Sequence, residues 1–285
     1  MLRKGDLTQG GITGTLLHFT LPMMVGSFLQ QCYNIADTLI VGQCIGAGAL
    51  AAVGSAYTLM VFLISVLLGL AMGSGTVFSL HYGAGNHVAL RRSIFSSFAL
   101  IGIVTLILNV AVFIWLDPIL RLLQVPQDIY GMMRSYLWII FCGIVFTFIY
   151  NFYASLLRAV GDSVTPIWFL AVSVVLNIAL DLFFILQLDW GIQGAAAATV
   201  LAQGVAALGI IIYTYRRRPE LRWHHEDMCF DRTCLKEIAS FSTLTCVQQS
   251  VMNLGILMIQ GLVNSFGTAV MAAFAAAVKI DSFAY

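Results

Sequence analysis

Long apolar stretches separated by short polar turns fill most of this chain. Residues 38–90, a run of 53, contain no Asp, Glu, Lys or Arg. Further charge-free windows cover residues 93–116, 135–157, 163–180, 190–215 and 238–278. A helix needs about 20 mostly apolar residues to cross the hydrocarbon core of a membrane. The two longest windows are therefore each long enough for more than one crossing.

Turn chemistry divides these windows into eight predicted helices. Gly-rich and Asn-containing segments mark most of the turns, and one break is expected at Asp117-Pro118, because proline disrupts a helix interior. The predicted helices cover roughly residues 15–42, 50–82, 92–116, 131–157, 164–188, 192–215, 235–262 and 268 to the end. The pattern predicts an all-α membrane protein, a polytopic helical bundle.

Composition supports the membrane assignment and excludes several classes of protein. Charged residues make up 9% of the chain and hydrophobic residues 60%, whereas soluble domains contain about 25% charged residues. A soluble enzyme and a disordered chain are therefore both excluded. The net charge of +1 provides no basic surface for nucleic acid. The lipid bilayer is the expected partner.

The distribution of Lys and Arg predicts the orientation. If the N-terminus is cytoplasmic, only Arg121 and Arg134 fall on the outer side. Eleven basic residues then lie on the inner side: Arg3, Lys4, Arg91, Arg92, Arg158, Arg216, Arg217, Arg218, Arg222, Arg232 and Lys236. Cytoplasmic loops are enriched in basic residues. We therefore expect a multi-pass protein of a bacterial-type cytoplasmic (inner) membrane with its N-terminus inside.

A short internal repeat suggests how the helices are grouped. The segment 46–54 resembles 267–275, which lies 221 residues later, and each opens the second helix of a pair. Six predicted helices separate the copies, so both have the same orientation, as in transporters built from parallel repeats. We therefore predict a six-helix N-terminal lobe (1–215), an inter-lobe linker (216–234) and the first two helices of a second, parallel lobe (235–285). A complete second lobe needs about 140 more residues, so the chain is expected to be truncated.

Polar residues inside the predicted spans are the candidates for function, because a charge in the membrane is costly. Gln30, Asn34 and Asp37 share one face of the first helix, beside Tyr33. Pro22, earlier in the same helix, is able to bend it.

The fifth and sixth predicted helices carry a second polar group. Asn177 and Asp181 share a face of the fifth helix, and Thr199 lies in a small-residue run of the sixth. Asp37 and Asp181, if they meet, repel each other unless a proton or a cation neutralises them. Such a site suits reversible binding of H⁺ or Na⁺, and local capping by each Asp is the alternative.

Two other polar groups receive no function. Lys279 and Asp281 lie in the last predicted span and, being two apart, face different directions, so pairing with other helices is expected. His224, His225, Cys229 and Cys234 cluster in the linker but lack the paired spacing of a structural zinc site. No metal site and no cofactor are predicted, apart from a transported H⁺ or Na⁺.

Several motifs, in the same order along the chain, resemble the multidrug and toxic compound extrusion (MATE) family of transporters. They are Leu21-Pro22 with Asn34 to Gly42, Gly46 to Gly54, Gly83 to Asn86, Leu157 to Pro166, and Asn177 to Asp181. The resemblance implies twelve helices in two six-helix lobes around a central cavity. It also implies antiport of amphipathic, often cationic, organic molecules against H⁺ or Na⁺. By the resemblance, the full-length protein is monomeric.

The resemblance also implies site residues. One branch of the family uses a cation site in the N-terminal lobe, and Asp37, Asn177, Asp181 and Thr199 match it position by position. Another branch uses acids in the C-terminal lobe, including one on helix seven, where this chain has Gln248 and Gln249 instead. Tyr33, Tyr136, Tyr150 and Tyr153 are candidates for stacking on cationic substrates.

Two other functions remain open at this stage. A flippase for lipid-linked oligosaccharides or peptidoglycan precursors has a similar fold but typically lines its cavity with Arg or Lys. The first six helices place none well inside the membrane. An intramembrane aspartyl protease is a remote alternative, because the sequence contexts of Asp37 and Asp181 differ from those of such proteases.

Overall fold

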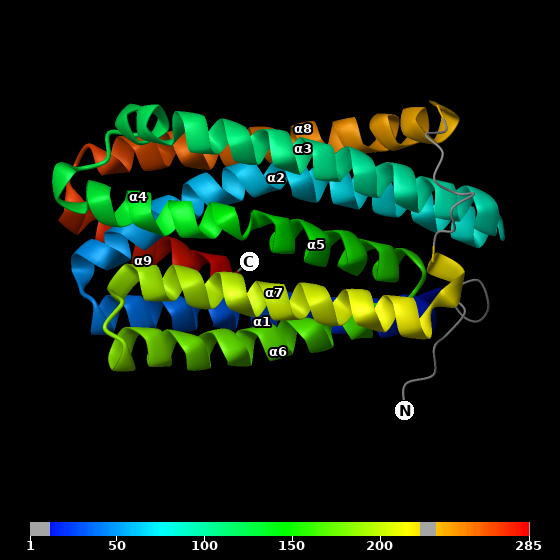
Figure 1. Ribbon diagram of the computed structural model, residues 1–285, viewed down its shortest axis with the longest axis horizontal. Coiled ribbons are helices and arrows are strands. Elements are labelled where there is room, and N and C mark those ends of the chain that lie inside the picture. Colours follow the sequence, from blue (N-terminus) through cyan, green and yellow to red (C-terminus); the bar gives the residue numbers. More distant parts are fainter. Residues whose placement is uncertain (1–11, 223–231, 285) are drawn as a thin grey trace.

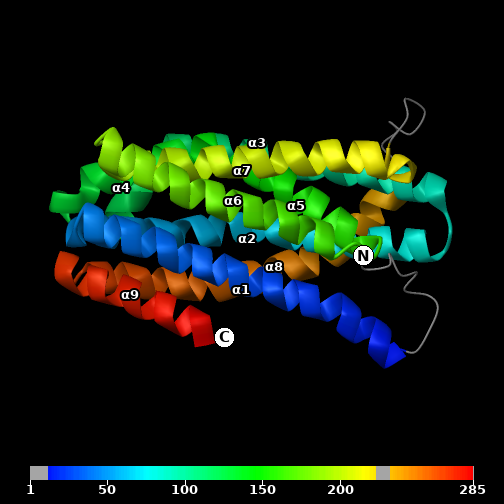
Figure 2. The ribbon, with the colours of Figure 1, turned by 90° about the horizontal axis from the view of Figure 1, so that it is seen from below.

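The computed structural model describes residues 12–222 and 232–284, and helices make up nearly all of this part. The long helices lie roughly side by side in one elongated bundle (Figures 1 and 2). The helices are α1 (Ile12–Cys44), α2 (Ala47–Gly83), α3 (His87–Leu122), α4 (Gln127–Cys142), α5 (Ile144–Ala159), α6 (Val164–Leu182), the π-helix η1 (Phe183–Gln187), α7 (Gly191–Arg217), the 3-10 turn η2 (Pro219–Leu221), α8 (Arg232–Asn264) and α9 (Thr268–Ala284).

The helix lengths confirm a polytopic membrane architecture. Among the described residues, α2, α3, α6 with η1, α7 and α8 are long and apolar enough to cross a membrane. The α4–α5 pair makes a sixth crossing if it counts as one bent span. Many large apolar side chains on these helices are exposed, for example Ile114, Trp168 and Leu208. Such side chains suit a lipid-facing surface.

The prediction of a single helix over 131–157 was wrong. A bend of 49° at Gly143 separates α4 from α5. A Cβ on this residue would lie 2.5 Å from the side chain of Val200, so α7 packs directly against the break. At the break, the Phe141 carbonyl accepts a hydrogen bond from Asn109 Nδ2 of α3 at 2.9 Å. A neighbouring helix thus helps to satisfy the interrupted backbone, as the membrane interior requires.

The expected helix break at Asp117-Pro118 was also wrong. Helix α3 continues through Pro118 to Leu122. Proline removes only one backbone hydrogen bond, and Pro118 stands only four residues before Leu122, the last residue of the helix. The Asp117 side chain instead forms an ion pair with Arg134 of α4, with 2.8 Å between Oδ1 and Nε.

Helices α2 and α8 pack closely against each other across the two predicted lobes. A Cβ on Gly69 would lie 2.5 Å from Cys246 Cα, so the two backbones nearly touch. Near one end of this contact, Asn264 of α8 bonds to Ser55 of α2. Small residues that allow close approach and polar side chains that bond across helices both stabilise membrane bundles.

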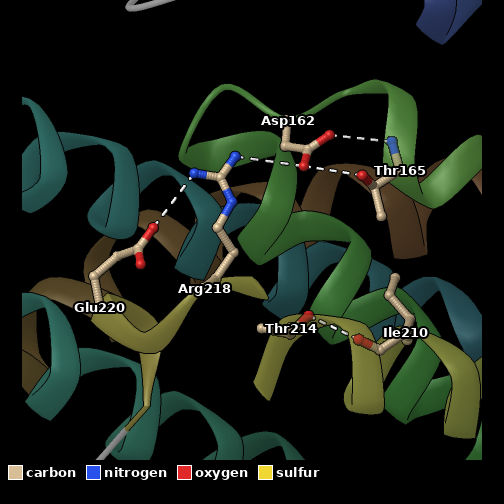
Figure 3. A network of polar contacts seen from close by, with 6 residues as sticks. All are labelled: Asp162, Thr165, Ile210, Thr214, Arg218 and Glu220. Carbon is tan, nitrogen blue, oxygen red and sulfur yellow. Dashed lines mark hydrogen bonds and ion pairs between the residues drawn. The ribbon is translucent and has the colours of Figure 1, made fainter. Parts of the chain in front are cut away.

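One end of the bundle, which we call the basic end, carries Arg91, Arg92, Arg158, Arg216, Arg217 and Arg218. It lies to the right in Figure 1. At this end Asp162, in the turn before α6, accepts hydrogen bonds from the backbone and hydroxyl of Thr165 at 3.1 and 2.9 Å. Arg218 pairs with Asp162 at 3.4 Å and with Glu220 at 3.3 Å (Figure 3).

The Asp162–Arg218 pair is shielded from water. The exposed fractions of the two side chains are 6% and 13%. Burial disfavours the charged guanidinium, but Asp162 and then Glu220 outweigh this effect and raise the pKa of Arg218. The network joins the turn before α6 to the end of α7.

Two groups of residues singled out in the sequence lie mostly outside the described part of the structure. His224, His225 and Cys229 lie outside the described residues, whereas Cys234 is buried with Sγ 3.5 Å from Ser93 Oγ. Lys279 and Asp281 lie on α9, but their side chains lie outside the described part.

Candidate functional site

The predicted polar groups of α1 and α6 meet in the interior of the bundle. Asp181 is fully buried and Asn177 is 1% exposed, although both lie in an apolar helix. Asp37 of α1 lies close enough to Asp181 for the two carboxyl groups to interact electrostatically. Because two carboxylates removed from water repel each other, the pair favours a bound proton or cation.

Asn177 links this carboxyl pair to α7. With its amide nitrogen facing Asp181, Asn177 donates to Asp181 Oδ2 at 2.9 Å and accepts from the Thr199 backbone N–H at 3.2 Å. Thr199 Oγ1 lies 3.4 Å from the hydroxyl of Tyr33, on α1. A connected polar network therefore runs through α1, α6 and α7 and contains all four predicted coupling residues and Tyr33.

The network offers oxygen atoms to a cation. Asp181 Oδ1 is buried and, within the described residues, has no hydrogen-bond donor. Carboxylate, amide and hydroxyl oxygens are the ligands that hard cations prefer. The same carboxyl pair is able to hold a single proton. The arrangement thus suits binding of either H⁺ or a cation such as Na⁺.

A cavity of about 360 Å³ adjoins the network and is enclosed by α1, α2, α4, α5 and α7. The polar face of α1, namely Gln30, Tyr33, Asn34 and Asp37, lines it. Thr199 lines it from α7. A molecule in the cavity is therefore within reach of the coupling network.

The candidate aromatic residues divide into two groups. Tyr136 and Tyr150 line the 360 Å³ cavity. Tyr153 lines neither this cavity nor the second one described below; its ring packs against those of Phe98 and Phe152, with centroids 6.4 and 5.5 Å apart. These contacts turn Tyr153 toward α3, and its assignment to the substrate cavity stays a prediction.

Several lining residues were missed in the sequence. Tyr57, Thr147, Asn151 and Gln203 also face the cavity. Each is a single polar residue in an apolar window, and that isolation is the one signal that could have marked them. Pro22 lies inside α1, which is unbroken from Ile12 to Cys44. Its role in bending this helix stays a prediction.

The fold and the polar cavity define a polytopic membrane protein with a polar site inside its helical bundle. The MatE family model matches residues 22–183, more than half of the chain. The chain belongs to the MatE family. The fold predicted from the sequence and the assignment as a non-enzyme are thereby confirmed.

Individual relatives agree with this assignment. The chain is 32% identical over 99% of its length to the probable multidrug resistance protein YpnP of Bacillus subtilis, and 28% identical over 93% to YoeA of the same organism. It covers 63% and 59% of those two proteins. It is also similar to the crystal structure of a point mutant of the Vibrio cholerae MATE transporter VcmN, with a TM-score of 0.83 and 25% identity over 95% of this chain and 61% of that one.

Proposed function

We propose that the protein acts in a secondary active antiporter that exports amphipathic, often cationic, drugs or toxic metabolites in exchange for H⁺ or Na⁺. The observation that carries the proposal is the interaction of Asp37, which lines the 360 Å³ cavity, with the buried Asp181. The names of YpnP and YoeA, both described as probable multidrug resistance proteins, support the substrate class.

The proposed coupling mechanism follows from charge. Two carboxylates that meet in the interior repel each other, and a bound proton or Na⁺ removes this repulsion. Because Asp37 belongs to α1 and Asp181 to α6, occupancy of the site changes how strongly the two helices attract. A coupling ion shifts a conformational equilibrium only by binding one state better than another. Bending of α1 near Pro22 is the proposed movement.

Replacement of Asp37 by Asn tests the proposal, because Asn keeps the size of the side chain and removes its charge. In the full-length protein reconstituted into vesicles, we expect Asp37→Asn to abolish ethidium efflux driven by an ion gradient. Gradients of H⁺ and Na⁺, imposed separately, identify the coupling ion. Asp189→Asn is the matched control, since Asp189 is exposed and has a φ of +53°, which Asn tolerates.

The outcome that contradicts the proposal is equally specific. If Asp37→Asn extrudes ethidium as fast as Asp189→Asn under both gradients, Asp37 takes no part in coupling. We expect the same loss for Asp181→Asn, because the two carboxyl groups form one site.

A further inference from the structure

A second cavity lies between α1, α5 and α6, closer to the basic end than the first. Its volume is about 320 Å³. It shares Gln30, Tyr150 and Asn151 with the 360 Å³ cavity, so the two adjoin. The coupling network does not use this second space.

The charge on its wall is positive. Arg158 is the one charged residue among those that line the second cavity. Within the described part of the chain, Arg158 forms no ion pair, whereas the nearby Asp162 is bonded to Thr165 and Arg218 (Figure 3). Asp162, the acidic residue nearest to Arg158 in the sequence, thus pairs with Arg218 instead.

A guanidinium in such a setting favours an anionic partner. Arg158 is only partly exposed, and a charge removed from water is costly unless an opposite charge or hydrogen bonds offset the loss. The planar fork of arginine matches the two oxygens of a carboxylate or phosphate group. A long arginine side chain is also able to extend toward water at a membrane surface, and the experiment below separates these two roles.

The remaining walls suit the rest of such a molecule. Ser27, Gln31 and Ser163 add hydroxyl and amide donors. Ile167 and Leu170 add apolar surface. The space therefore combines a cation, neutral donors and an apolar wall, which together fit an anionic group on an apolar body.

We propose that Arg158 is the anion-binding group of a second ligand site, which takes the carboxylate or phosphate group of an amphipathic molecule. The site goes beyond the proposed antiport, because binding there requires no ion gradient and no function of Asp37. Two sources supply this chemistry, a soluble organic anion and the headgroup of an acidic lipid.

Matched fluorescent probes test the proposal. Dansylglycine carries a carboxylate, and dansylglycinamide replaces it with a neutral amide of nearly the same size. Both are titrated into the full chain in phosphatidylcholine nanodiscs. We expect dansylglycine to bind at least about tenfold more tightly than the amide, since a charge-assisted bidentate contact distinguishes them.

Variants assign the preference to one residue. Arg158→Gln should remove the preference for dansylglycine, and Arg158→Lys should keep part of it, because lysine retains the charge without the bidentate geometry. Arg217→Gln is the charge-matched control at the same end of the bundle, where Arg217 is exposed. It should bind both probes as the unmodified protein does.

A lipid arm identifies the source of the anion. If phosphatidylglycerol in the nanodiscs weakens dansylglycine binding to the unmodified protein, an acidic headgroup occupies the site; if binding is unchanged, a soluble anion does. Both results support the proposal. Equal affinity of the unmodified protein for the two probes overturns it. So does equal weakening of dansylglycine binding by Arg217→Gln and Arg158→Gln.

Discussion

The buried side chain of Asn264 connects three parts of the bundle, and its removal should destabilise the contact between α2 and α8. Asn264 Nδ2 donates to the Leu123 carbonyl at 2.8 Å and to Ser55 Oγ at 3.2 Å, and Oδ1 accepts from Gln260 Nε2 at 2.8 Å. The exposed fractions of Asn264, Ser55 and Gln260 are 1%, 0% and 3%. Water therefore has little access to replace these bonds.

The magnitude follows from the number of bonds. Side-chain hydrogen bonds between membrane helices contribute about 0.6 kcal/mol each, and the bond to Gln260 within α8 contributes a similar amount. Loss of the two bonds to Ser55 and Leu123 and of this third bond therefore costs about 2 kcal/mol. Asn264→Leu has a similar volume and leaves the Leu123 carbonyl and the Ser55 hydroxyl without this partner. An unsatisfied buried group adds a further cost of about 1 kcal/mol or more. We expect a total loss of about 2–4 kcal/mol.

Thermal unfolding in detergent, followed by tryptophan fluorescence, measures this loss. At about 2 °C per kcal/mol for a chain of this size, Asn264→Leu should unfold about 4–8 °C below the unmodified protein. Gln248→Leu is the control, because Gln248 is an exposed residue of the same helix. If the two variants unfold at the same temperature, the hydrogen bonds of Asn264 do not stabilise the α2–α8 contact.

The same assay checks two other contacts. Gly69→Ala should lower the unfolding temperature by an amount equivalent to about 1–3 kcal/mol, because its Cβ would overlap the backbone of α8; Gly83→Ala, with open space around it, should not. Equal effects of the two would show that the close approach is not required. Arg218→Met should cost about 3 kcal/mol, because it leaves a buried carboxylate without its cation. An equal loss in Arg217→Met, at an exposed position, would contradict that reasoning.

The helices could be predicted from the sequence because the membrane imposes a simple rule on apolar length. Each predicted helix corresponds to one helix or to the bent pair α4–α5. The break at Gly143 could not be predicted, because it depends on the approach of Val200 from α7. A contact between segments that are far apart in the sequence cannot be recognised from the apolar residues of either segment alone.

The site could be predicted in part for a related reason. Asp37 and Asp181 stand out because a carboxyl group inside a membrane span requires an explanation. The packing of Tyr153 against Phe152 could not be predicted, because an aromatic residue is equally suited to a cavity and to a core. Arg158 was assigned to the inner surface from its place near a helix end, and its position in a cavity wall required the three-dimensional arrangement of α1, α5 and α6.

The bend at Gly143 also explains an isolated amide in a different helix. Asn109 is a polar residue in an apolar stretch of α3, where an amide group is unfavourable unless it has a hydrogen-bond partner. Its hydrogen bond to the Phe141 carbonyl makes it the partner of the break. Asn109 and Gly143 therefore act together. Gly143 interrupts the helix between α4 and α5, and Asn109 donates a hydrogen bond to a backbone carbonyl at this break. If a substitution restored a straight helix at Gly143, Asn109 would change from a stabilising residue into a buried amide with no acceptor.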